Sequence, residues 1–559
     1  MLKKTKFRVT VNSVLIYIVC VVFATGCTTF SEKIAKVPKD HILMFDYKGH
    51  PVEPCTFATP PIPNHAGSSE KYKPNICEEV PKGVWPEDYR LQDNSDFDRH
   101  LGNIFKGMDS YFRRKAEECS QNEKCEKYEK KVLFYVHGGL NSRGGSLERV
   151  GELYQAIKDE GYYPIFINWH SGLLSTYGDH LVNIRQGEDS PFIGYLTAPV
   201  YLGIDLARSI VRAPIVWGSL LLNDLKSNPS IEKKFFDTTA IEIADNISTP
   251  PNPDEDICEE TITKGAGKFS VYRGEDCRTD SEKARYALVY AGTLPLTKLP
   301  SAPFIDSFGT SSWSNMLRRV QLLYNGDREY HAYSKGNPPQ EGNLYDPKPK
   351  NYLNIPASGG LSRFMKQFMN SFQNELKQRE VKLTLVGHST GTNVLNELIR
   401  NFGVTGQDSP PASSMILPID NIVYMAAAST VSHFQSTVIP YLLQNDETNF
   451  YNLTLGREAE IRDEYFGLTP RGSLLVWIDE FLSTPLTHRD RTLGRFDNFM
   501  LTAHEIPPQL RERIHLKTYS TGDPVRKTNP QHHTDFGSIK FWNKDCWTKT
   551  SKNCYQKSN

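Results

Sequence analysis

The sequence lacks an excess of charge of either sign. Its 559 residues include 65 lysines and arginines against 65 aspartates and glutamates, so the formal net charge is zero. Proteins that bind nucleic acid usually carry a basic surplus, and this balance therefore gives no support to a nucleic-acid partner. Hydrophobic residues at 38% and charged residues at 23% indicate a soluble globular protein, and the length allows two or three domains.

The sequence also lacks an apolar run that is typical of a transmembrane helix. Residues 9–23 are mostly apolar, but the stretch is short and contains Asn12 and Ser13. Residues 192–222 are apolar as well, but prolines and charged residues interrupt them. We interpret this second stretch as one or two amphipathic helices, which either cover a pocket or are buried in an insertion.

The N-terminus has the features of an export signal. Basic residues precede the stretch 9–23, and the small residues Ala24-Thr25-Gly26 lead directly into Cys27. This arrangement resembles the lipobox of bacterial lipoproteins, which implies that residues 1–27 are a signal peptide and that Cys27 is lipidated. By the same analogy, Thr28 after the cysteine favours the outer membrane, so we expect a chain held in the cell envelope by a lipid anchor. An ordinary cleaved secretory signal and an uncleaved anchor stay open as alternatives.

The sequence has no cysteine cluster with the Cys-X-X-Cys spacing or histidine partners of a zinc site, and we expect no metal and no organic cofactor. Ten cysteines are present, and setting aside Cys20 and Cys27 leaves eight, an even number that agrees with export to an oxidising compartment. These eight fall in close sequential pairs within polar stretches. We therefore expect four local disulfides: Cys55 with Cys77, Cys119 with Cys125, Cys258 with Cys277, and Cys546 with Cys554.

Internal repeats are absent, and the sequence pattern divides the chain into five parts. These are the signal peptide 1–27, an N-terminal extension 28–130, a core formed by 131–170 and 358–545, an insertion 171–357, and a tail 546–559. In the core, strands over 131–136 and 163–169 with a helix over 147–160 predict a right-handed parallel βαβ unit. Further strands are predicted over 381–386, 419–428, 450–455 and 514–519, a strand in the insertion over 286–291, and further helices over 94–127, 313–323 and 361–378.

The stretch 381–400 carries the strongest chemical signal. An apolar run typical of a buried strand leads into Gly387-His388-Ser389-Thr390-Gly391, and the residues that follow have helical spacing. A Gly-X-Ser-X-Gly turn between a strand and a helix is typical of a nucleophile elbow, in which the serine is strained and only small residues fit two positions away. Such a turn would present the hydroxyl of Ser389 to a substrate. The alternative is a serine in an ordinary glycine-bounded loop.

Together with the predicted strands, this elbow resembles the α/β-hydrolase fold of esterases and lipases. The resemblance covers about residues 130–170 and 358–545, and its motifs are the His137-Gly138-Gly139 strand end, the elbow, and a histidine after the last strand. It implies a mostly parallel sheet flanked by helices, with a large insertion before the nucleophile strand. Because the family's cap more often follows a later strand, the equivalence of the insertion 171–357 to a cap stays open.

The resemblance also implies which residues would complete a catalytic triad. The base would be His533, on the loop after the strand 514–519, with the adjacent His532 as its rival; His504 and His515 are poorer candidates. The acid would follow the strand 450–455, which makes Glu458 the leading candidate, with Glu460 and Asp463 as nearby competitors. If 514–519 is instead the strand that precedes the acid, then Asp523 is the alternative.

An oxyanion hole would need two backbone amides. The resemblance implies that one belongs to Thr390, directly after the nucleophile, and the other to Gly139 in the loop after the strand 131–136. His137 would brace that loop through hydrogen bonds and take no part in the chemistry. A plain strand-to-loop glycine pair is the alternative.

These features predict a serine hydrolase that cleaves a small-molecule or lipid ester, or a thioester, through an acyl-enzyme on Ser389. The alternative from another class is a non-catalytic surface lipoprotein that uses a hydrolase scaffold for binding or assembly, because a fold does not fix a function. A peptidase or an amidase is a third possibility.

Overall fold

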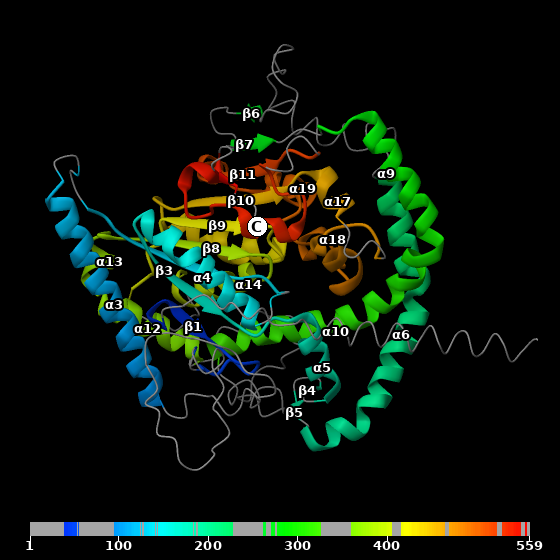
Figure 1. Ribbon diagram of the computed structural model, residues 1–559, viewed down its shortest axis with the longest axis horizontal. Coiled ribbons are helices and arrows are strands. Elements are labelled where there is room, and N and C mark those ends of the chain that lie inside the picture. The colour runs from blue at the N-terminus through cyan, green and yellow to red at the C-terminus, as the bar shows by residue number, and fades with distance from the viewer. Residues whose placement is uncertain are drawn as a thin grey trace, which may run out of the picture.

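A nine-stranded β-sheet lies at the centre of the molecule in the computed structural model (Figure 1). The strands follow the order β1-β3-β2-β8-β9-β10-β11-β7-β6, and every neighbouring pair is parallel except β6 and β7. Their bounds are β1 (Ile42–Met44), β2 (Lys130–Val136), β3 (Tyr162–Asn168), β6 (Thr261–Thr263), β7 (Ser270–Arg273), β8 (Val381–His388), β9 (Asn421–Met425), β10 (Asn449–Leu455) and β11 (Ile514–Tyr519).

The structure describes most of the core and parts of the rest of the chain. The described residues are 39–52, 94–122, 128–139, 143–182, 191–226, 270–273, 277–325, 359–404, 415–463, 469–522 and 528–548, together with short pieces at 54, 125, 141, 184–185, 188–189, 261–263 and 554–555. The expected signal peptide 1–27, with Cys27, and Asp523 lie outside them.

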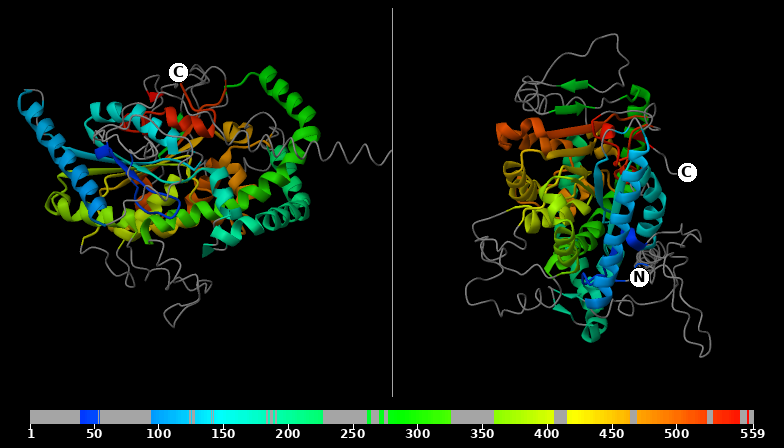
Figure 2. Two further views of the ribbon diagram at one scale, coloured as in Figure 1. Left: turned by 60° about the horizontal axis from the view of Figure 1, so that its bottom comes forward. Right: turned by 90° about the vertical axis from the view of Figure 1, so that its left-hand side faces the viewer.

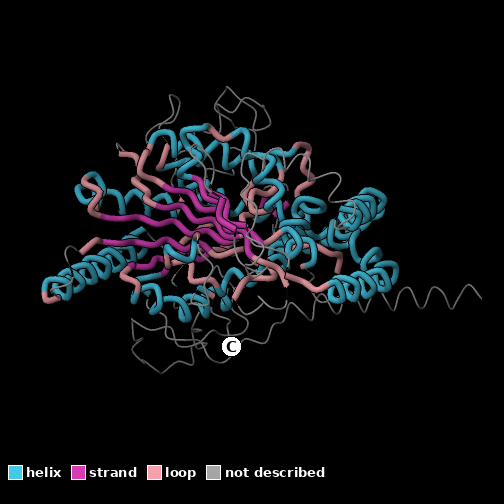
Figure 3. Tube along the Cα trace, turned by 90° about the horizontal axis from the view of Figure 1, so that it is seen from above, coloured by secondary structure: helices cyan, strands magenta, loops and turns pink. Residues whose placement is uncertain are grey.

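The inner strands are buried along almost their whole length. In β8, every residue except Lys382 and His388 is buried. A parallel sheet requires such strands because helices cover both of its faces, and Figure 3 shows helices on either side of the strands. The α/β class that the sequence predicts is therefore confirmed, as are the strands of the predicted core.

The helices outside the insertion include five longer ones and a series of short ones. The longer α-helices are α3 (Asn94–Ser120), α4 (Arg143–Asp159), α12 (Gly360–Ser371), α14 (Gly391–Phe402) and α19 (Phe496–Thr502). The short α-helices are α13 (Gln373–Lys377), α15 (Val431–His433), α16 (Ile439–Gln444), α17 (Arg457–Arg462) and α18 (Leu474–Trp477). Short 3-10 or π-helical turns are η1 (Lys39–His41), η5 (Phe434–Val438), η6 (Ile478–Leu482), η7 (His488–Asp490), η8 (Ala503–Glu505), η9 (Pro508–Arg513), η11 (His533–Ser538) and η12 (Lys544–Trp547).

The insertion is mainly helical where it is described. It contains α5 (Leu173–Val182), α6 (Pro191–Lys226), α9 (Asp280–Thr293), the π-helical turn η3 (Leu294–Lys298) and α10 (Leu299–Asn325), with an antiparallel pair of short strands, β4 (Ile184–Arg185) and β5 (Glu188–Asp189). The predicted helices over 192–222 and 313–323 are confirmed within α6 and α10. Figure 2 shows α6 and α9 at the end of the molecule opposite α3.

The strand predicted over 286–291 is wrong, because these residues lie in the middle of α9. A capping box begins this helix: the side chain of Thr279 accepts a hydrogen bond from the backbone of Glu282, and the Glu282 side chain accepts one from the backbone of Thr279. That local signal for a helix start outweighs the short apolar run that suggested a strand.

Both edges of the sheet come from outside the predicted core. The extension supplies β1, which pairs with β3. The insertion supplies β7, which pairs with β11, and the edge strand β6, which pairs with β7. The extension and the insertion are therefore built into the same sheet as the core.

One end of the molecule exposes an unusual amount of apolar side chain, which we call the apolar surface. On α6, Val211 is 77% exposed, and on α9, Leu288 is also 77% exposed. The other members are Leu196, Val200, Ile204, Ile210 and Ile215 on α6, Val289 on α9, and Leu296 on η3. No helix within the described residues is long and apolar enough to cross a membrane.

Two of the four expected disulfides are confirmed. They join Cys119 to Cys125 and Cys546 to Cys554. Cys277 is also disulfide-bonded. The remaining expected partners, Cys55, Cys77 and Cys258, lie outside the described residues.

Candidate active site

Ser389 stands at the turn between β8 and α14 in a conformation that non-glycine residues rarely adopt. Its φ is 51°, in the left-handed region. The backbone holds it there, because the Ser389 amide donates to the carbonyl of Met425 at 2.8 Å and its own carbonyl accepts from the amides of Thr392 and Ala428, each at 3.1 Å. The neighbouring strand end therefore fixes the strained turn that the sequence predicts.

The glycines on either side of Ser389 are needed for close packing. A Cβ atom at Gly391 would lie 2.4 Å from the carbonyl oxygen of Val136, at the end of β2. A Cβ atom at Gly387 would lie 3.1 Å from the backbone of Thr392, on the far side of the same turn. Side chains at these positions would push the turn away from β2 and out of the conformation that presents Ser389.

The loop after β2 packs directly against the elbow. A Cβ atom at Gly138 would lie 2.9 Å from the Cβ of Ser389, and one at Gly139 would lie 2.6 Å from the Oγ1 of Thr390. Among the described residues, the amides of Gly139 and Thr390 donate no hydrogen bond. The two segments that the sequence nominates for an oxyanion hole are thus brought together.

His137 braces this loop. Its Nδ1 donates to the carbonyl of Gly138 at 2.9 Å, and its Nε2 accepts from the amide of Trp169 at 3.2 Å, a pairing that fits one neutral tautomer. The Ser171 hydroxyl also donates to the Gly138 carbonyl. Burial lowers the pKa of His137 to about 4, so the ring is neutral at physiological pH.

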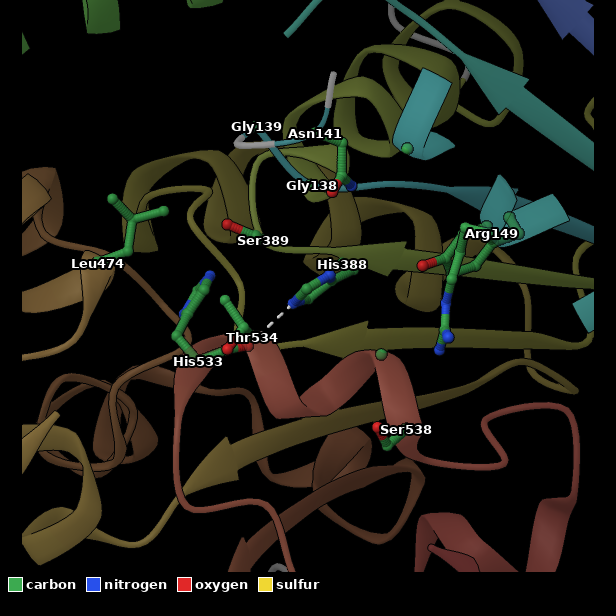
Figure 4. Close-up of a pocket in the computed structure, with 13 residues that line it drawn as sticks. Gly138, Gly139, Asn141, Arg149, His388, Ser389, Leu474, His533, Thr534 and Ser538 are labelled. Carbon is green, nitrogen blue, oxygen red and sulfur yellow. Dashed lines mark hydrogen bonds between the residues drawn. The ribbon is translucent and has the colours of Figure 1, made fainter. Parts of the chain in front are cut away.

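His533 reaches the same cavity as Ser389. It lies at the start of η11, after β11, and both side chains line a cavity of about 210 Å³ (Figure 4). Burial lowers the pKa of His533 well below its ordinary value, and His388 adds to the shift, so the imidazole is neutral and able to accept a proton. Neither its ring nitrogens nor the Ser389 hydroxyl has a hydrogen-bond partner among the described residues, which suits a site whose bonds tighten around a substrate.

The other two histidines of the region hold the His533 segment in place. The Nε2 of His388 lies 3.3 Å from the carbonyl oxygen of His533, and the two rings stack with centroids 5.4 Å apart. His532 turns its Nδ1 to Asp463 instead, and its side chain is 44% exposed. Of the two rivals for the base, only His533 lines the cavity with Ser389.

Among the acid candidates that the structure describes, Asp463 is the one that contacts the histidine segment. It follows α17, is buried, and accepts hydrogen bonds at 2.8 Å from the backbone amide of His533 and from the Nδ1 of His532. Glu458 instead forms an ion pair with Arg278. Glu460 is buried and accepts a hydrogen bond from the Ser473 hydroxyl. The structure therefore does not bring the leading sequence candidate, Glu458, to His533.

The cavity also contains residues that the sequence analysis did not single out. Arg149 is the most prominent, because it is a charged side chain on the wall of the cavity that holds Ser389. The sequence did contain a signal for Arg149. This residue lies in the helix that follows the Gly138-Gly139 loop, near the carboxyl edge of the sheet, where ligands bind in open α/β sheets. Asn141, Leu474 and Ser538 line the cavity as well.

The described residues include no group of three histidine, cysteine, aspartate or glutamate side chains that could hold a metal ion.

Comparison of the chain with protein-family models, with curated proteins and with solved structures finds no match. The site combines a strained serine, a buried neutral histidine, and a loop packed on the elbow whose Gly139 amide donates no hydrogen bond among the described residues.

Proposed function

We propose that the protein is a serine hydrolase with an α/β-hydrolase fold that cleaves carboxylic esters or thioesters. The observation that carries this proposal is the placement of Ser389 and His533 in one cavity, from elements 144 positions apart in the chain (533 − 389), with the Gly138-Gly139 loop packed on the elbow. A buried, unpartnered serine hydroxyl beside a buried, unpartnered imidazole is difficult to explain as a device for stability, because burial of unpaired polar groups is unfavourable.

In this proposal the reaction proceeds through an acyl-enzyme. The Ser389 Oγ attacks the carbonyl carbon of the ester while its proton passes to His533. The amides of Thr390 and Gly139 stabilise the oxyanion of the tetrahedral intermediate. The intermediate collapses, the alcohol or thiol leaves with the proton from His533, and water then attacks the acyl group by the same sequence in reverse.

The lipid anchor at Cys27 and the position of the chain in the cell envelope belong to this proposal as well. Both come from the lipobox-like signal in the sequence, and an anchored enzyme would work close to lipid esters. The non-catalytic alternative has a weaker basis, since it predicts no histidine near Ser389, and His533 lines the same cavity.

A fluorophosphonate probe tests the proposal directly. We expect the mature protein to be labelled on Ser389, and Ser389→Ala to take no label. We expect His533→Ala to lose at least about 1,000-fold in kcat/KM on a 4-nitrophenyl ester, since a nucleophile and its base act as a unit. His532→Ala is the matched control and should lose far less. Equal labelling of the wild type and Ser389→Ala would refute the proposal.

A further inference from the structure

The walls of the cavity carry charge of only one sign. Among its described lining residues there is no carboxylate, and the charged side chain is Arg149. The two lining histidines do not add charge. Burial lowers the pKa of His388 to about 4, although its hydrogen bond with the His533 carbonyl opposes the shift, and burial lowers the pKa of His533 well below its ordinary value. At neutral pH, a molecule that enters the cavity therefore meets a cation and no anion.

The guanidinium of Arg149 is only partly satisfied by the protein. Its Nη1 donates to Glu152, one turn along α4, at 2.7 Å, and the Glu152 side chain is 46% exposed. Its Nη2 is buried and has no hydrogen-bond partner among the described residues. A buried donor without a partner is unfavourable. A ligand oxygen that accepts a hydrogen bond from this nitrogen would remove that penalty, which favours binding.

The opposite wall packs closely against this nitrogen. A Cβ atom at Gly537, on η11, would lie 3.1 Å from the Arg149 Nη2 and 3.4 Å from its Cζ. Glycine at this position therefore keeps a larger side chain from crowding the guanidinium. The Tyr135 hydroxyl also lies near: the charge of Arg149 and a side-chain hydrogen bond with it both oppose the rise that burial imposes on the pKa of Tyr135.

We infer that Arg149 binds an anionic group of the substrate, so that the preferred substrates are esters with a carboxylate or phosphate on the same molecule. This inference rests on the proposed hydrolase function and adds the substrate class to it. A planar guanidinium suits the paired oxygens of a carboxylate or phosphate better than it suits any neutral group. Because Nη1 donates to Glu152 and Nη2 has no hydrogen-bond partner among the described residues, Nη2 is the donor for the ligand.

The position of Arg149 also limits the shape of such a substrate. In Figure 4 the His388 side chain lies between Ser389 and Arg149. The anionic group must therefore be several bonds away from the reacting carbonyl. A flexible chain that runs along the cavity wall past His388 would join the two ends.

Matched ester pairs test this inference. The substrates are 4-nitrophenyl monoesters of adipic, suberic and sebacic acid, each compared with the same ester capped as a methyl ester, and a phosphate-terminated ester of the adipate length. The rate measured with the Ser389→Ala protein is subtracted from each rate to correct for spontaneous hydrolysis. For the wild type, we expect kcat/KM to favour at least one anionic ester over its capped partner by about 10- to 100-fold, the range for a hydrogen-bonded charge pair.

Substitution of Arg149 should abolish this preference. We expect Arg149→Met to bring the anionic-to-capped ratio of kcat/KM close to one, and Arg149→Lys to retain part of it because it keeps a point charge. Glu152→Gln, which removes the competing carboxylate, should keep or raise the ratio. The matched control is Arg113→Met on α3, whose side chain is 74% exposed and also pairs with a carboxylate on its own helix. This variant should leave the ratio unchanged.

The outcomes separate this inference from the function on which it rests. If the wild type hydrolyses both members of each pair and Arg149→Met leaves their ratio unchanged, the anion site is refuted and the hydrolase stands. If the wild type hydrolyses neither and takes no fluorophosphonate label, the hydrolase is refuted, and the anion site with it. Labelling of Arg149→Met at Ser389 verifies that this variant is folded.

Discussion

Asp463 organises the segment that carries His533. Its two carboxylate oxygens accept from the His533 amide and from the His532 ring, both at 2.8 Å, and the residue is buried. Charge-assisted hydrogen bonds of this kind are about twice as strong as neutral ones. Asp463 therefore positions the base by holding its backbone, whereas Glu458 is occupied by Arg278.

We predict that Asp463→Ala lowers kcat on an ester substrate by about 100- to 10,000-fold with a small change in KM, because a misplaced base affects the chemical step more than binding. Glu458→Ala should lower kcat by less than about 10-fold. Steady-state kinetics with active sites counted by fluorophosphonate titration measure both. The reverse ranking of the two variants would show that Glu458 is the acid.

Site residues that belong to a short local motif could be predicted from the sequence. Ser389, Gly139 and Thr390 follow from short motifs, and the structure brings them together. The acid could not be chosen in this way. Glu458, Glu460 and Asp463 lie within six positions (458 to 463), and which of them faces His533 depends on the direction of α17 relative to η11. Arg278, which pairs with Glu458, comes from a distant insertion.

Hydrogen bonds join the segments that carry the short helices α17 and α18, and α18 forms part of the cavity wall. The Ser473 amide donates to the Glu460 carbonyl and the Gly472 amide to the Asp463 carbonyl, both at 2.8 Å. The Ser473 hydroxyl donates to the Glu460 carboxyl and also caps α18, which presents Leu474 to the cavity. Burial raises the pKa of Glu460 to about 8, although Ser473 and Arg495 oppose the shift. The Glu460 carboxyl that bonds to Ser473 is therefore mostly protonated at neutral pH.

We predict that Glu460 makes stability depend on pH. The folded protein binds this proton more tightly than the unfolded chain, whose ordinary value is 4.5, so the stabilisation is complete below pH 4.5 and is lost as the pH rises to about 8. Glu460→Gln stays neutral throughout. Its free energy of unfolding in urea should exceed that of the wild type at about pH 8, by on the order of a few kcal/mol, and approach it at about pH 4.5.

The control for this experiment is Glu447→Gln, because the Glu447 side chain is 63% exposed. We expect this substitution to give no such pH-dependent difference. A Glu460→Gln difference that stays constant across the pH range would show that the carboxyl is ionised in the folded protein.

Elements with strong periodicity could be predicted from the sequence, and elements made by distant pairing could not. The strands β2, β3, β8, β10 and β11 are apolar runs long enough to stand out. In contrast, β1 has three residues and β7 has four, and each becomes a strand only because a distant edge is available to it. A run this short carries little information about its own conformation.

At the scale of the whole molecule, the apolar surface on α6, α9 and η3 is the most unusual property. Its members are 54% to 77% exposed, and so many exposed large apolar side chains at one end of a molecule are uncommon on soluble monomers. A surface of this kind associates with other apolar material in water, since burial lowers its free energy. The solution behaviour of the protein should therefore depend on this end of the molecule.

We predict that the triple variant Leu196→Gln, Val211→Gln, Leu288→Gln binds less of an apolar fluorescent dye and self-associates less than the wild type. Its free energy of unfolding should change by less than about 1 kcal/mol, because the side chains are exposed. Sedimentation velocity and dye titration measure the effects. The control is Leu486→Gln, a residue that is 94% exposed but lies outside the apolar surface. Equal dye binding by all three proteins would contradict the prediction.

The pairing of β7 with β11 has a consequence for synthesis. Ser270 lies opposite His515, so a ribosome releases the first strand long before the second exists. During translation, β7 has no hydrogen-bonded neighbour on the β11 side until almost the entire polypeptide has emerged. A shortened gene product that stops before residue 514 would keep that edge permanently open, and open edges recruit other chains. Any engineering of the insertion should therefore leave residues 270–273 in place.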